Sequence, residues 1–168
     1  MKTYTYFVEG ECEQKLLNVI KANPSLIKPG KVHVLNVIQE RIKDSQLFSI
    51  KEGYVIFVFD SDVPKVDILK ENIKKVKSSC PAKAVKLLHL VQVPKFEHEL
   101  VRSTNVRRAA EITGSRSNKD FKSDFLALHD CRAVLERKGF DIRKMWRMEV
   151  PEPFNSIVSQ GTDFLVKS

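Results

Sequence analysis

Short apolar runs alternate with longer amphipathic stretches over the first half of the chain. The apolar runs cover residues 4–8, 32–38, 54–59 and 85–91. Runs of this length that are rich in aromatic and β-branched residues are typical of buried strands. Apolar side chains spaced three or four apart predict helices over residues 11–22 and 64–79, and a weaker pattern favours a short helix at 39–49. This alternation predicts an α/β fold with a mostly parallel four-stranded sheet flanked by helices.

The second half of the chain has a different pattern. Helical spacing predicts two helices, over residues 97–112 and 120–138, with a loop between them. The apolar stripe of the second predicted helix consists of Phe121, Phe125, Leu128 and Leu135. We expect Trp146 to pack in the core rather than to stack on a base. Residues 151–168 show no clear period, which leaves a strand, a docking tail and partial disorder open.

Acidic residues follow two of the apolar runs at the point where each run ends. Glu9 comes directly after the first run, and Asp60 and Asp62 follow the third. Because ligands bind where the carboxyl ends of parallel strands meet, we expect these side chains to lie close together. Taken singly, such acids are also explained by helix starts and turns. Taken together, clustered carboxylates repel one another and favour a bound cation such as Mg²⁺, which prefers oxygen ligands.

The net charge of the chain indicates what kind of partner it binds. The formal net charge is +8 and the pI is about 9.4. Basicity of this size favours a polyanionic partner, and the alternative is a basic surface that binds no nucleic acid. The basic residues that we expect to contact nucleic acid are Arg102, Arg107, Arg108, Arg116 and Lys119. An acidic pocket within a basic shell suits a metal-dependent nucleic-acid enzyme, because the shell holds phosphates and the pocket holds cations.

Cysteine usage and the N-terminus indicate the compartment. The three cysteines, Cys12, Cys80 and Cys131, are widely spaced and form no CxxC pair, which favours a reducing cytosol. No apolar run approaches the ~20 residues of a membrane span. The N-terminus reaches acidic residues too early for a signal peptide. We therefore expect a cytoplasmic protein with no membrane partner, and the sequence leaves its oligomeric state open.

Two stretches of the sequence carry a resemblance to the Toprim domain. Residues 7–17 read FVEGECEQKLL and resemble the VEGxxExxLL motif of Toprim nucleases, and the DSD at 60–62 resembles the second Toprim motif. Toprim domains occur in topoisomerases, bacterial primases, small ribosomal-RNA maturases and the overcoming-lysogenization-defect class of nucleases, and the chain is most similar to the small nucleases of this last class. The resemblance covers residues 4–93. It implies a Toprim-like catalytic core at 1–93. The helical pattern that follows predicts a C-terminal extension at 94–168, packed on the core, with 151–168 as a candidate flexible tail.

The resemblance also implies a set of site residues. In the family, carboxylates at the two acidic strand ends bind one or two Mg²⁺ or Mn²⁺ ions. The implied metal ligands are Glu9, Glu13, Asp60, Asp62 and Glu97, and the implied catalytic residues are Glu9, Asp60, Asp62 and Lys122. Glu97 and Glu99 are spaced two apart and do not share one face of a helix, so at most one is expected to be a ligand unless this segment is an extended loop, and Glu97 is preferred. Lys122, with Lys119 as the alternative, would supply the positive charge that steadies the transition state.

The implied function is metal-dependent hydrolysis of phosphodiester bonds in DNA or RNA, and the family suggests an anti-phage setting. The sequence contains no recognisable ATPase domain, zinc ribbon or tyrosine-bearing topoisomerase domain. A standalone nuclease, a subunit of an ATPase-coupled complex and a non-catalytic Toprim-like subunit that binds nucleic acid or a partner ATPase all stay open. A more distant alternative is a receiver-type α/β protein that binds Mg²⁺ for phosphorylation, which the glutamate-glycine arrangement disfavours.

Overall fold

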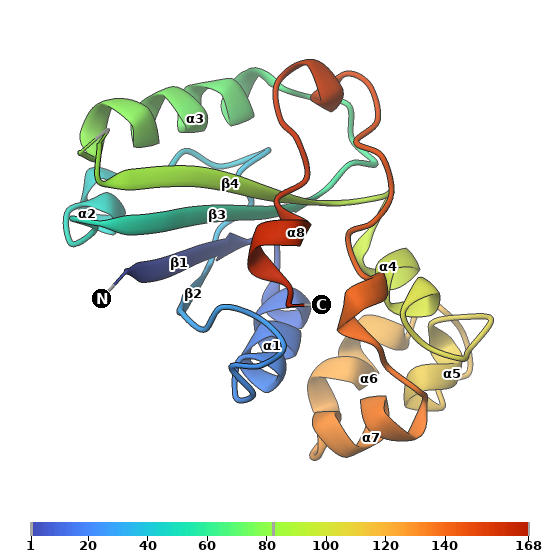
Figure 1. Cartoon of the computed structure of the whole chain (residues 1–168). Helices are drawn as coiled ribbons and strands as arrows, with labels where there is room; N and C mark the ends of the chain where they lie inside the picture. The colour runs from blue at the N-terminus through green and yellow to red at the C-terminus, as the bar shows by residue number, and fades with distance from the viewer. Residues whose placement is uncertain (1, 82, 168) are drawn as a thin grey trace.

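The computed structural model of the chain describes residues 2–81 and 83–167 and is built around one parallel sheet (Figure 1). The strands are β1 (Thr3–Val8), β2 (Lys31–Val34), β3 (Gly53–Asp60) and β4 (Val85–Gln92). Their order across the sheet is β2-β1-β3-β4, and every neighbouring pair is parallel. The predicted fold class is therefore confirmed, and the arrangement is consistent with a Toprim-like fold.

Helices cover both faces of the sheet and enclose a separate apolar cluster on each. Side chains alternate along β1, so that Tyr6 and Val8 face one cluster and Phe7 faces the other. The helix α1 (Glu11–Ile20) packs on the Tyr6 face. The helices α2 (Asp44–Leu47) and α3 (Asp67–Ser79) lie on the opposite face. Every residue of β3 is buried, which explains why its sequence reads as one continuous apolar run.

The order of the strands creates a switch point between β1 and β3. The chain leaves β1 to form β2 on one side of it, and then crosses back to form β3 on the other side. The helices that follow β1 and β3 lie on opposite faces of the sheet, so a crevice forms beyond the carboxyl ends of these two strands. Both predicted acidic strand ends lie at this edge.

The second half of the chain forms short helices, and those between residues 96 and 137 lie below the sheet in Figure 1. The elements of this half are α4 (Phe96–Arg102), α5 (Ala110–Thr113), α6 (Phe121–Ala127), α7 (Cys131–Arg137), the 3-10 turns Ile142–Lys144 and Phe154–Ser156, and α8 (Thr162–Leu165). The helices α6 and α7 contact α1, and the rings of Phe121 and Phe125 are fully buried. Trp146 is only 1% exposed, which confirms the prediction that it packs in the core.

The predicted helices at 97–112 and 120–138 are both wrong in extent. The first ends after Arg102, where the hydroxyls of Ser103 and Thr104 donate to the carbonyl of Leu100 at 3.1 and 2.7 Å. Such side-chain bonds offer the backbone an alternative to the helical ladder. The second is interrupted at 128–130, where Asp130 caps a new helix by accepting from the Ala133 N–H at 2.9 Å.

Shorter elements than predicted also occur in the first half of the chain. The strand expected at 32–38 is Lys31–Val34, and the helix expected at 39–49 is only Asp44–Leu47. Asn36 explains the early end of the strand, because its Oδ1 accepts from the Ile38 N–H at 3.0 Å and closes a turn there.

The described part of the C-terminal stretch, 151–167, packs on the rest of the molecule. Phe154 is fully buried against Phe59, with ring centroids 5.5 Å apart. Val166 forms an antiparallel bridge to Ile27, and Leu165 is fully buried. Of the three alternatives for this stretch, docking on the core describes it. No helix in the described ranges has the length and apolar character needed to cross a membrane.

Candidate functional site

The two acidic strand ends lie next to each other in the structure. The register of β1 and β3 places Val8 beside Val58, so Glu9 and Asp60 follow at the same edge of the sheet. The Asp60 N–H donates to Glu9 Oε2 at 2.8 Å. The structure therefore brings together the first and second predicted acids across 51 positions of sequence.

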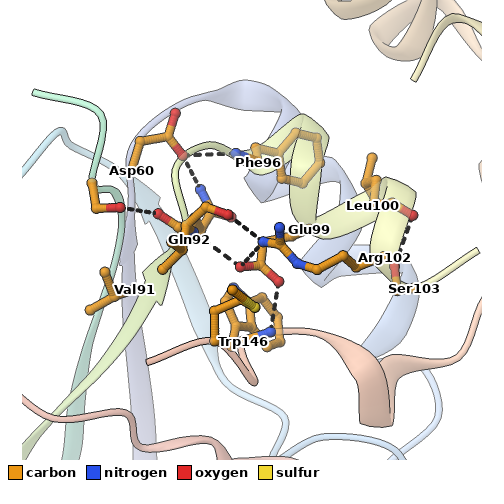
Figure 2. A network of polar contacts seen from close by, with 12 residues as sticks. Asp60, Val91, Gln92, Phe96, Glu99, Leu100, Arg102, Ser103 and Trp146 are labelled. Carbon is orange, nitrogen blue, oxygen red and sulfur yellow. Dashed lines mark hydrogen bonds and ion pairs between the residues drawn. The ribbon is translucent and has the colours of Figure 1, made fainter. Parts of the chain in front are cut away.

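Asp60 is the most strongly perturbed carboxyl of the site. Its side chain is buried, with 5% of the residue exposed. Asp60 Oδ1 accepts from Gln92 Nε2 at 2.6 Å and from the Phe96 N–H at 2.9 Å (Figure 2). Burial, followed by the negative charges of Glu9 and Glu13, raises the pKa of Asp60 to about 8. The donors that surround it are neutral, so they do not balance its charge.

Glu13 is buried beside Asp60 and shares a donor with it. The exposed fraction of Glu13 is 4%, and its Oε1 accepts from Gln92 Nε2 at 3.2 Å. Burial raises the pKa of Glu13 above its ordinary value, and burial followed by the charge of Glu13 does the same for Glu9. Gly10 fits this arrangement, since a Cβ at that position would lie 3.2 Å from Glu13 Oε2.

Gln92 was not identified from the sequence, and it links the two buried acids. Its exposed fraction is 0%, and it lies opposite Asp60 in the register of β3 and β4. Its side-chain oxygen is buried and has no hydrogen-bond partner among the described residues. A polar residue at the carboxyl end of a predicted strand was the available signal, because such a position lies at the ligand-binding edge of a parallel sheet.

Asp62 is held at the outer part of the site by a lysine. Lys95 Nζ lies 3.2 Å from Asp62 Oδ2, and both side chains are partly exposed. The hydrogen bond to Asp62, and then its charge, raise the pKa of Lys95. Lys95 is a second residue that sequence reasoning missed, since its role depends on where α4 begins.

Glu97 and Lys122 form a second acid–lysine pair at the site. Lys122 Nζ is 3.6 Å from Glu97 Oε1, and Glu97 Oε2 is buried without a hydrogen-bond partner in the described chain. Partial burial lowers the pKa of Lys122, but the carboxylates around it, Glu97 first, outweigh this effect, so the net change is upward. The predicted acid and the predicted lysine thus contact each other at the site.

Glu99 has a different environment from Glu97. It is fully buried, and Arg102 Nη2 donates to its Oε1 at 2.8 Å. The Val93 N–H at 3.1 Å and the Trp146 N–H at 2.8 Å also donate to its carboxylate (Figure 2). Arg102 also donates to the Val93 carbonyl. The arginine predicted to contact nucleic acid is therefore tied to an internal acid, although 31% of its side chain stays exposed.

The other predicted nucleic-acid contacts are exposed. Arg107 and Arg108 precede α5, and Arg116 and Lys119 lie between α5 and α6. Arg108 Nε lies 3.4 Å from Glu111 Oε1 in an exposed pair. Three of the five basic residues, Arg102, Arg107 and Arg108, thus lie near α4. Arg116 and Lys119 lie in the loop between α5 and α6.

The chemistry of the donors fits Mg²⁺ or Mn²⁺, because the converging groups are carboxylates. The carboxylates do not yet form a complete metal site, since no three His, Cys, Asp or Glu side chains of residues 2–81 and 83–167 lie close enough to hold one ion. Protein donors hold the carboxylates instead: Gln92 holds Asp60 and Glu13, and Lys95 holds Asp62. The unpartnered oxygen of Glu97 and the raised pKa of Asp60 mark an excess of negative charge in this site.

Comparisons with known proteins add no relative. No protein-family model, no curated protein and no solved structure matches the chain. The Toprim resemblance is therefore a hypothesis that rests on the residues and on the strand order.

Proposed function

We propose that the chain is a metal-dependent nuclease that hydrolyses phosphodiester bonds of DNA or RNA. The observation that carries the proposal is the convergence of the buried Glu13 and Asp60 with the half-buried Glu9, short of balancing positive charge, at the switch point of a parallel sheet. Buried like charges of this kind favour a bound cation over empty carboxylates. The basic chain around them, with a net charge of +8, favours a polyanionic substrate.

Each residue of the site has a distinct part in this proposal. Glu9, Glu13 and Asp60 would hold one or two Mg²⁺ or Mn²⁺ ions, with Asp62 and Glu97 as outer candidates. Bound there, such ions supply a nucleophilic water at neutral pH and stabilise the leaving oxygen. Lys122, 3.6 Å from Glu97, offers a positive charge to the phosphate oxygens of the substrate. The Phe96 N–H fixes one oxygen of Asp60 and leaves the other available.

The second candidate function is a non-catalytic Toprim-like subunit that binds nucleic acid or a partner ATPase. One observation favours it: the Gln92 amide donates to both Asp60 and Glu13, where a cation would otherwise balance them. A partner ATPase and an anti-phage setting rest on the family resemblance alone.

Cleavage assays with matched variants test the proposal. We expect the wild-type chain to cut labelled DNA or RNA with Mg²⁺ or Mn²⁺ and not with chelator. Asp60→Asn and Glu9→Gln should each reduce cleavage by about a hundredfold or more, as loss of one electrostatic catalytic group does. Glu11→Gln is the control, because Glu11 is an exposed acid in the first turn of α1.

The same assay separates the two candidate functions. Salt-sensitive binding without products, under all metal conditions, supports the binding subunit. Full cleavage by purified Asp60→Asn contradicts the assignment of the site, whatever the substrate.

A further inference from the structure

A pocket of about 350 Å³ adjoins the acidic site. Its walls come from α4 and from the segment that leads into α5. Its lining includes Lys95, His98, Val101, Arg107, Arg108 and Ala109. Two lining residues also belong to the acidic site: Lys95 lies 3.2 Å from Asp62, and Glu97 lies 3.6 Å from Lys122. The pocket and the acidic site are therefore separated by single side chains.

Some of the arginines that line the pocket are paired with acids, and one is not. Arg102 is paired with the buried Glu99, and Arg108 with Glu111. Arg107 also lines the pocket and is exposed, and its guanidinium has no ion-pair or hydrogen-bond partner within the described residues. Arg107 is thus the guanidinium that is free to bind an anion, and its fork of N–H donors matches a phosphate.

The size and floor of the pocket select the kind of anion. A volume of about 350 Å³ is near the lower end of ligand pockets, so it suits one nucleotide and not a double helix. Val101 is half-buried and Ala109 is buried, which gives the pocket an apolar floor. His98 and the arginines at the rim have flat side chains of the kind on which unpaired bases stack.

We propose that this pocket binds one unpaired nucleotide of a single-stranded nucleic acid, with its phosphate on Arg107 and its base over Val101 and Ala109. The inference rests on the proposed function, because it names the substrate class of the same site. A strand held in this pocket has its next phosphate directed past Lys95 and Glu97 toward the acids around Asp60. The pocket thus makes the chain selective for single strands or unpaired ends.

Binding measured without metal tests the pocket independently of cleavage. Fluorescence anisotropy in EDTA compares short labelled single-stranded DNA and RNA with a duplex of the same sequence. We expect tighter binding of single strands. Arg107→Ala should weaken that binding roughly five- to tenfold and lower the slope of log K against log salt by about 0.7, the value for one phosphate contact on a single strand. Arg107→Lys should retain most of the slope, because it keeps the charge.

The control is Arg137→Ala, which removes the same charge from an exposed arginine of α7 that does not line the pocket. Equal weakening by Arg107→Ala and Arg137→Ala, or equal affinity for duplex and single strand, overturns the pocket. Selective binding by a chain that cuts nothing with Mg²⁺ or Mn²⁺ supports the pocket and contradicts the nuclease. Cleavage by a chain whose Arg107→Ala variant binds normally supports the nuclease and contradicts the pocket.

Discussion

Two buried carboxylates, Glu99 in α4 and Asp60 at the end of β3, have opposite surroundings (Figure 2). Glu99 is fully buried and accepts from Arg102 at 2.8 Å and from two backbone N–H groups. Asp60 is 5% exposed and accepts from the neutral donors Gln92 and Phe96, with further acids beside it. The negative charge of Glu99 is balanced by Arg102, and the donors to Asp60 do not balance its charge.

The difference shows which property distinguishes a structural acid from a functional one. Burial is nearly the same for Glu99 and Asp60, so burial alone does not separate them. The charge of the donors does, because a buried carboxylate with a guanidinium partner is complete. A buried carboxylate with neutral donors and acidic neighbours takes up a proton or a cation instead. The pKa of Asp60, raised to about 8 by burial and then by Glu9 and Glu13, reflects this.

The largest expected effect comes from breaking the balanced pair. Glu99→Ala removes the partner of Arg102 and leaves the Trp146 and Val93 N–H groups unpaired in the interior. We expect a loss of about 3 kcal/mol of unfolding free energy, the lower end of the range for a buried pair, because Arg102 is partly exposed. Urea unfolding measures it.

Glu136→Ala is the matched control for Glu99→Ala. Glu136 also pairs with an arginine at 2.8 Å, but both partners are more than 60% exposed. Exposed pairs contribute less than about 1 kcal/mol. Equal losses for the two variants would show that the buried network around Glu99 has no special structural role.

Asp60→Asn should have a smaller effect of opposite sign, a gain in unfolding free energy. Because its folded pKa lies near 8, above its ordinary value, the folded chain keeps a proton that the unfolded chain has released between about pH 4 and 8. Without metal, the unfolding free energy therefore falls as pH rises through this window, by up to about 1.4 kcal/mol per pH unit for this one proton. This value is an upper bound, because Asp60 titrates together with Glu9 and Glu13. Asp60→Asn removes the contribution and should be about 1–3 kcal/mol more stable than wild type at pH 8.

Urea unfolding in EDTA at several pH values checks the Asp60 prediction. The control is Asp67→Asn, at an exposed acid in the first turn of α3, which should leave the pH slope unchanged. Wild-type and Asp60→Asn chains with the same slope would contradict the charge imbalance at this site. Added Mg²⁺ should raise the stability of wild type more at pH 8 than at pH 6, since protons compete for the same oxygens.

The parallel sheet was predictable because its signals are local. Residues 54–59 form a strand that is buried on both faces, so an apolar run identifies it without knowledge of its neighbours. The long helices were over-predicted because periodicity does not register side-chain bonds such as that from Thr104 to Leu100. The cap at Asp130 did carry a local signal, an acid directly before an apolar segment, that the helical period concealed.

The part of the site that lies at the ends of the strands was predictable from the sequence. The approach of Glu9 to Asp60 follows from their places at the ends of neighbouring parallel strands. The role of Gln92 depends on the register that sets it opposite Asp60, and the sequence does not specify that register. Arg102 was assigned to nucleic acid on charge, although its spacing of three from Glu99 was a readable sign of an internal pair.

The smallest expected effect tests whether Gln92 occupies the place of a cation. Gln92→Met keeps the volume and removes the donor that Asp60 and Glu13 share, so we expect a loss of about 1–2 kcal/mol without metal. Mg²⁺ should then stabilise the variant more than wild type, because it no longer displaces an amide. Thermal unfolding with and without Mg²⁺ measures both changes.

Gln160→Met is the control. The Gln160 amide bonds only backbone groups, so the stability that this variant loses should be the same with and without Mg²⁺. Stabilisation by Mg²⁺ that is the same in all three chains would show that Gln92 and the cation do not compete.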